Sequence, residues 1–420
     1  MIRSPGYGVP APTALVPVML GILSMLGSFT IDTPFPAFPA MAHSLGVGTA
    51  DLQLLVSVYL IAYAAMGLFH GPLSDAVGRR PVMLAGLLVY AVASIGCAVS
   101  TSLAALLTFR TVQGLSVGGA TIVSTTVVRD LYEGETAQRL MSRIAVIFGI
   151  APAFGPIAGG WLLMLGDWRL IFFAQAILGG GLAILLLLLP ESHPVERRTP
   201  LQISELVGGL LDVARDATFL RLTFANALLF GGQFLYIGGS AVFVVDVLGQ
   251  SKLDYWKLFV PMIGSMTLGA WICGRATGHA TARQLATFGS VVAIIGGAIG
   301  AVVAQTSLSI DIPWAIVGLS IISLGVGMTF PSIQLTLLDA FPLRRGAAVS
   351  LFLSTVLLIN SATTALLIPR VGDSASGFAN CALVGVVFGG FVWVWQWVTT
   401  RRSRAMTLPP DQAAAGDREA

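Results

Sequence analysis

The chain has 420 residues, of which 55% are hydrophobic and only 10% are charged. A soluble domain carries about 25% charged residues, so the composition excludes an ordinary soluble globule and predicts a protein that crosses a membrane many times. The formal net charge of +3 gives no reason to expect a nucleic-acid partner. The three cysteines lie in apolar runs without metal-ligand spacing, and we interpret them as small buried hydrophobic residues.

About twelve apolar runs are long enough to span a bilayer, since a spanning helix needs about 20 mostly apolar residues. They cover residues 14–39, 51–69, 81–100, 103–128, 140–165, 170–189, 219–245, 255–274, 285–304, 312–338, 347–368 and 378–399. A membrane β-barrel would instead show alternating segments of about ten residues. The sequence therefore predicts an all-α polytopic membrane protein with 12 transmembrane helices.

A polar break divides these runs into two sets of six. We expect an N-terminal six-helix bundle over 1–190, a cytoplasmic linker over 191–217, a C-terminal six-helix bundle over 218–400 and a disordered cytoplasmic tail over 401–420. Most of the 23 Lys and Arg residues fall on one side of this topology. Because basic residues are enriched in cytoplasmic loops, both termini are predicted to be cytoplasmic.

The stretch 71–80 is short and charged and separates two apolar runs. We expect it to be an aqueous turn on the cytoplasmic side, with Pro72 and Pro81 at the ends of the flanking helices. Gly71 and Gly78 would allow close backbone approach or a positive φ. Its charged side chains are Asp75, Arg79 and Arg80.

Asp32 and Arg110 lie well inside apolar runs of the first half. Asp32 and Arg110 each lie about seven residues from the outer end of a predicted helix, which places both about 10 Å below the surface. An ionisable side chain in lipid is expensive and by default a functional hypothesis. Burial favours the neutral form of a carboxyl group, as a proton carrier requires, although a structural acid or a structural Arg contact remains an alternative.

Small residues recur every four positions in the run 140–165. Ala151, Gly155 and Gly159 form a groove for close helix packing, and Pro156 bends the helix. Packing alone accounts for this pattern, so by itself it does not indicate a function.

Several of these segments resemble the major facilitator superfamily. The stretch 71–80 resembles the family's loop between helices 2 and 3, and the motif that begins at Asp32, Asp-x-x-x-Pro-x-x-Pro, resembles helix 1 of the Bcr/CflA group of drug:proton antiporters. Arg110-x-x-Gln113-Gly resembles the helix-4 motif associated with proton transfer. Gly-Pro-x-x-Gly-Gly at 155–160 resembles the antiporter motif, in which Gly160 is the last glycine.

The same resemblance extends to the end of the fourth run. Arg129-Asp-x-Tyr is similar to a Bcr/CflA pattern, and Arg129 with Asp75, Arg79 and Arg80 is expected to form a cytoplasmic ion-pair cluster that locks the two halves in one state. A plain solvated charged face is the alternative.

Polar and aromatic residues at helical spacing are candidates to line a substrate cavity. They are Tyr59, Tyr63, Gln113, Asn226, Gln233, Tyr236, Gln334 and Asn360. Aromatic stripes often serve packing alone, so packing is the alternative for each.

The sequence contains no nucleotide-binding loop, catalytic triad or zinc ligand set, so we expect a transporter without cofactors that uses a proton gradient and is not an enzyme. The resemblance implies a monomeric drug:proton antiporter of the bacterial inner membrane, whose partners are protons, lipid and a small amphipathic substrate. An exporter of one metabolite or sugar and a non-transporting sensor or scaffold are the alternatives.

Overall fold

The computed structural model describes residues 15–132, 154–198, 201–251, 253–276, 279–342 and 344–407, together with 140 and 144. These residues form helices and turns and no β-strand. Ten helices in this part of the chain are long and apolar enough to cross a membrane. The helix Phe154–Leu165 and α9 (Ala217–Gly238) occupy the places of the two remaining predicted spans.

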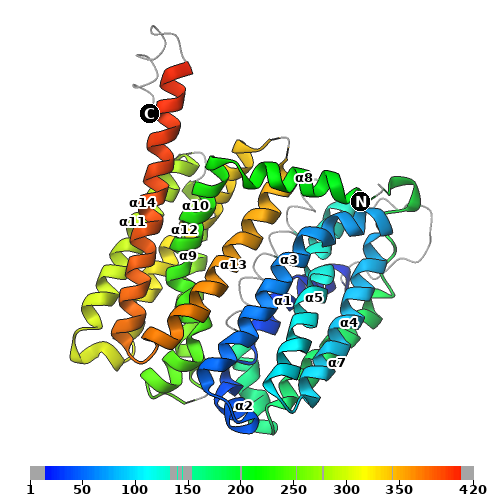
Figure 1. Ribbon diagram of the computed structural model, residues 1–420, viewed down its shortest axis with the longest axis horizontal. Coiled ribbons are helices and arrows are strands. Elements are labelled where there is room, and N and C mark those ends of the chain that lie inside the picture. The colour runs from blue at the N-terminus through cyan, green and yellow to red at the C-terminus, as the bar shows by residue number, and fades with distance from the viewer. Residues whose placement is uncertain are drawn as a thin grey trace.

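The helices form two bundles that lie side by side (Figure 1). The N-terminal bundle contains α1 (Leu15–Asp32), α3 (Gln53–Val77), α4 (Arg79–Val99), α5 (Leu103–Leu131), Phe154–Leu165 and α7 (Arg169–Leu186). The C-terminal bundle contains α9, α10 (Tyr255–Ala276), α11 (Ala282–Val303), α12 (Trp314–Ala340), α13 (Arg345–Val371) and α14 (Ala375–Thr407). The bundles contact each other along α3 and α13. The all-α prediction is therefore confirmed.

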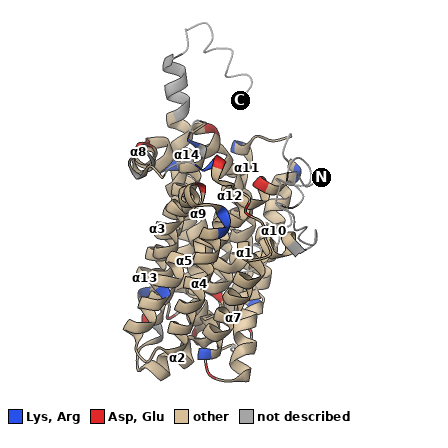
Figure 2. Ribbon diagram, turned by 90° about the vertical axis from the view of Figure 1, so that its right-hand side faces the viewer, with Lys and Arg blue, Asp and Glu red and all other residues tan. Residues whose placement is uncertain are grey.

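Charged residues are sparse along these helices (Figure 2), and large apolar side chains are exposed on their outer faces. Val92 on α4, Ile177 on α7 and Phe391 on α14 are each more than half exposed. Lipid chains can cover such surfaces, so the outward-facing side chains need no protein partner.

The predicted turn over 71–80 is wrong in extent. Helix α3 continues through Pro72 to Val77, and α4 begins at Arg79, so Gly78 alone breaks the helix, at φ +114°. Gly71 lies within α3, where an added Cβ would meet no atom within 4 Å. Close approach and positive φ therefore apply to Gly78 and not to Gly71.

The first predicted span is also shorter than expected. Helix α1 ends at Asp32, and the chain continues as a 3-10 turn, Phe35–Ala37, and the short helix α2 (Phe38–Leu45). The prolines between Asp32 and Pro39 cause this break, because proline has no N–H to donate within a helix.

The linker and the tail contain more helix than the sequence indicates. The segment between the bundles includes α8 (Ile203–Ala214), which lies across one end of the molecule, opposite α2 (Figure 1). Helix α14 continues to Thr407, so the predicted disorder over 401–420 is wrong for its first residues.

Candidate functional site

The guanidinium group of Arg110 lies in the interior of the N-terminal bundle. Arg110 is 1% exposed. It donates from Nη1 to the carbonyl oxygen of Thr30 at 3.3 Å and to Gln113 Oε1 at 3.0 Å, and from Nε to the carbonyl oxygen of Leu55 at 3.4 Å. Its Cζ also lies 4.6 Å from the centre of the Tyr59 ring. Arg110 thus connects α1, α3 and α5 through neutral acceptors.

Asp32 occupies the last position of α1 and is 3% exposed. Within the described part of the chain its carboxyl group forms no ion pair and no hydrogen bond, although Arg110 is close enough to interact with it electrostatically. A buried carboxylate without a partner is unfavourable.

The glycine groove of Phe154–Leu165 packs against the same end of α1. A Cβ on Gly155 would lie 2.8 Å from the Cβ of Asp32, and a Cβ on Gly159 would overlap the carbonyl oxygen of Thr33. Pro156 and Gly160 are buried in the same helix. The small residues thus bring this helix into backbone contact with the acid-bearing turn; Ala151 and Pro152 lie outside the described residues.

A network of neutral polar side chains surrounds Arg110. Gln113 Nε2 donates to Ser94 Oγ at 2.6 Å and to Gln175 Oε1 at 3.2 Å, and Thr30 Oγ1 lies 2.7 Å from Tyr90 Oη. These bonds join α1, α4, α5 and α7. Gln113 is fully buried among them and is therefore a member of the network rather than an open cavity wall.

Tyr59 and Tyr63 on α3 face α1 and α5. Tyr59 Oη donates to the carbonyl oxygen of Gly27 at 3.1 Å, and Tyr63 Oη lies 3.1 Å from Thr121 Oγ1. Both hydroxyl groups have partners within the N-terminal bundle. The two rings are stacked with their centres 6.3 Å apart.

The candidate residues of the C-terminal bundle form a less uniform set. Asn226, Gln233 and Asn360 are each 1% exposed, whereas Gln334 is half-buried. Gln233 Nε2 on α9 lies 3.6 Å from Met266 Sδ on α10. Asn226 Nδ2 and Gln233 Oε1 are buried and have no hydrogen-bond partner in the described part of the chain. Such atoms demand an explanation, and a polar substrate or ordered water would supply their partners.

Tyr236 has a different environment from the other candidates. Its ring centre lies 4.9 Å from that of Phe243 and 5.3 Å from that of Phe378. It is therefore part of an aromatic cluster among α9, the π-helix Val242–Val247 and α14. This environment favours a packing role for Tyr236 over a role in a substrate cavity.

The charged residues at the junction of α3 and α4 form a cluster within the N-terminal half. Arg79 pairs with Asp75 at 2.5 Å and with Asp130 at 3.0 Å. The Glu191 carboxylate accepts from the backbone N–H groups of Arg79 and Arg80, at 3.0 and 3.2 Å, and so caps α4.

None of the ion pairs described for this cluster reaches the C-terminal bundle. The expectation that the cluster locks the two halves stays a prediction, because the described ion pairs include Arg79 but not Arg129. Its second acid is Asp130, the neighbour of Arg129, and the Arg129 side chain lies outside the described residues.

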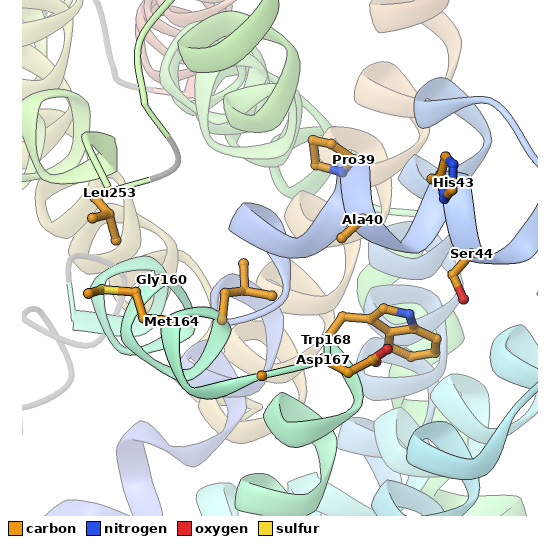
Figure 3. Close-up of a pocket in the computed structure, with 11 residues that line it drawn as sticks. Pro39, Ala40, His43, Ser44, Gly160, Met164, Asp167, Trp168 and Leu253 are labelled. Carbon is orange, nitrogen blue, oxygen red and sulfur yellow. The ribbon is translucent and has the colours of Figure 1, made fainter.

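A separate pocket of about 640 Å³ opens at the α2 end of the molecule (Figure 3). His43 and Ser44 on α2, Asp167 and Trp168 before α7, and Leu253 of the C-terminal half line part of it. Of the predicted site residues it contains only Gly160, so it is distinct from the Asp32–Arg110 region.

Sequence reasoning missed Thr30, Tyr90, Ser94 and Gln175. Each is a neutral residue in an apolar run, where charge gives no signal. One signal was available for Thr30, because Pro34 lies four residues later and removes the helical partner of its carbonyl group.

The two helical bundles with a buried acid and arginine in the first define a membrane-transporter architecture. The family model of the Major Facilitator Superfamily matches residues 20–364, and the chain belongs to this family. It is 26% identical over 405 residues to Multidrug resistance protein D of Escherichia coli, with 92% of this chain and 96% of the relative covered. It is 32% identical over 263 residues to a chloramphenicol resistance protein of Pseudomonas aeruginosa, with 61% of each chain covered.

The fold has a solved counterpart. A bacterial homologue of the human lysosomal transporter Spinster, in an inward-facing and unoccupied conformation, superposes with a TM-score of 0.74 at 16% identity. This match covers 96% of this chain and 100% of the other. At that identity the likeness concerns the fold, which is the 12-helix fold that the sequence predicts.

Proposed function

We propose that the protein is a proton-coupled antiporter that exports small amphipathic compounds, including drugs, from the cytoplasm by alternating access. The supporting observation is the environment of Asp32, which is buried at the end of α1, forms no ion pair with the described residues and lies near the cationic Arg110. An acid in this position can exist neutral in one conformation and ionised in another. Proton binding then changes the relative stability of the two conformations, as coupling requires.

The names of the relatives support the substrate class. Proteins named for multidrug, bicyclomycin and chloramphenicol resistance are among them. In this proposal the substrate occupies the space between the bundles, with Asn226, Gln233, Gln334 and Asn360 on the C-terminal side. We further propose a monomer in the bacterial inner membrane with both termini in the cytoplasm, as the distribution of basic residues favours.

Transport by purified protein in proteoliposomes tests the proposal. A pH gradient should drive chloramphenicol or ethidium against its concentration gradient, with counterflow of protons reported by a pH-sensitive dye. Asp32→Asn imitates the protonated side chain, so it should retain binding of a neutral substrate and lose uphill transport.

Asp373→Asn is the matched control, because Asp373 is an exposed acid after α13 and should not affect coupling. Full uphill transport by Asp32→Asn would exclude Asp32 as the proton carrier. Efflux that ignores the pH gradient would favour a facilitated exporter, and binding without transport would favour a sensor.

A further inference from the structure

The carbonyl oxygen of Thr30 lacks the partner that an α-helix would normally give it. That partner is the N–H of the residue four positions later, which here is Pro34 and has no N–H. The next candidate, the N–H of Thr33, donates to Phe29 instead, at 3.1 Å. Thr30 is fully buried, so bulk solvent does not reach its carbonyl oxygen.

Two side chains supply that donor together. Arg110 Nη1 lies 3.3 Å from the Thr30 oxygen and Gln175 Nε2 lies 3.4 Å from it, so α5 and α7 share one carbonyl on α1. A carbonyl oxygen has two lone pairs and can accept both bonds. Pro34 thus creates an acceptor two residues before Asp32, and Arg110 and Gln175 occupy it.

The amide orientations follow from Arg110, which can only donate. Gln113 must present Oε1 to Arg110, at 3.0 Å, so its Nε2 points to Gln175 Oε1, at 3.2 Å. The Nε2 of Gln175 is then left for the Thr30 carbonyl. The network thus assigns Gln175 the role of donor to Thr30.

We propose that Gln175 is a positioning residue that keeps the Thr30 carbonyl hydrogen-bonded when Arg110 turns towards ionised Asp32. This proposal rests on the proposed function, in which Asp32 releases its proton. The proton leaves the Asp32 carboxyl group for water, and Arg110 stays protonated throughout. Arg110 then exchanges a neutral acceptor for the carboxylate, and Gln175 remains on the carbonyl.

The titratable groups that interact with Arg110 identify Asp32 as the group towards which Arg110 turns. They are Asp32 on α1, Tyr59 on α3 and Tyr90 and Cys97 on α4. Asp32 is the one carboxyl group among them. Without Gln175, movement of Arg110 would leave a buried carbonyl unsatisfied, which is unfavourable. That penalty would fall on the ionised state alone, so Asp32 should lose its proton at a higher pH.

The proton itself is the readout, so the test does not depend on a particular substrate. Infrared titration of the purified full-length protein follows the protonated carboxyl band that Asp32→Asn removes. Gln175→Met preserves approximate volume and removes the hydrogen bonds. We expect it to raise the titration midpoint by about one pH unit, since loss of a hydrogen bond to a buried group changes an equilibrium by roughly tenfold.

Pro34→Ala offers a rescue, because it restores an N–H four residues after Thr30. The double variant Pro34→Ala, Gln175→Met should therefore titrate close to the wild type. Gln53→Met is the matched control. Gln53 is 2% exposed, and neither of its amide atoms bonds to a described residue, so the midpoint should not move.

An unchanged or lowered midpoint in Gln175→Met, in protein that remains folded, would overturn the proposal. If Gln175→Met does not fold, the double variant decides: a raised midpoint there contradicts the role of the Thr30 carbonyl. If Gln175→Met shows the expected shift but the wild-type protein shows no gradient-driven efflux, the proposed function is refuted and the role of Gln175 stands.

Discussion

The hydroxyl group of Tyr255 donates a hydrogen bond to the carbonyl oxygen of Phe35 at 3.2 Å and so joins the two halves of the protein. Tyr255 begins α10 and is 1% exposed, and Phe35 lies in the turn between α1 and α2. A second bond between the halves links Ser354 Oγ to the carbonyl oxygen of Ala64 at 2.9 Å. In the proposed alternating-access mechanism the halves separate at the α2 end, and the Tyr255 bond would then break in the other conformation.

Tyr255→Phe should shift the protein towards the state that is open at the α2 end. The lost hydrogen bond is worth about 1 kcal/mol, which corresponds to a roughly fivefold change in the conformational equilibrium. Distances between spin labels across the α2 end measure this shift. Tyr90→Phe is the control, because the Tyr90 hydroxyl contacts Thr30 within one half; an equal shift in both variants would contradict the assignment of Tyr255 as a tie.

Gly159→Ala should abolish transport while membrane insertion is retained. The added Cβ would overlap the Thr33 carbonyl, and overpacking of this kind costs about 1–3 kcal/mol. Gly180→Ala is matched to it, since Gly180 is also helical and its added Cβ would meet no atom within 4 Å. Efflux assays in cells with equal expression compare the two, and normal efflux by Gly159→Ala would exclude tight packing against α1.

Arg79→Ala should destabilise the protein far more than Arg80→Ala. The Arg79 side chain is 7% exposed and pairs with Asp75 and Asp130, so its removal leaves both acids without their cation and costs about 2–3 kcal/mol. Arg80 donates to the exposed carbonyl of Leu187, and its loss should cost less than about 1 kcal/mol. Thermal unfolding in detergent gives both values; equal melting temperatures would count against the cluster.

Cysteine labelling tests the predicted orientation in the membrane. In a variant without the three native cysteines, Ser374→Cys should react with an impermeant reagent from the periplasm and Glu196→Cys only from the cytoplasm. Both positions are exposed, whereas Ser192, in the same linker, is 6% exposed and bonds to Asp130. The opposite labelling pattern would reverse the topology.

Local chemistry accounts for the parts of the architecture that the sequence predicted. Long apolar runs identified the helices because lipid requires every backbone group to bond within its own segment. The polar residues 191–217 indicated the break between the two sets of helices, because charged side chains are unfavourable in lipid. Where the prediction of a helix end was wrong, as at Pro72 in α3, the helix tolerated a residue that usually ends one.

Only part of the candidate site could be predicted from the sequence. Asp32 and Arg110 were predictable, because a charge inside an apolar run stands out in one dimension. The partners of Arg110 were not, because they are backbone carbonyls and neutral amides from other helices.

By itself, the sequence determined that this chain is a helical membrane protein of twelve spans with an acid and an arginine in the first half. Only the tertiary structure decided that Arg110 contacts the Thr30 carbonyl while Asp32 has no hydrogen-bond partner among the described residues. It also decided that Arg79 pairs with Asp75 and Asp130, which both lie in the N-terminal half. The physical reason is that helix periodicity fixes which residues share a face, whereas packing between helices far apart in the chain fixes which polar groups meet.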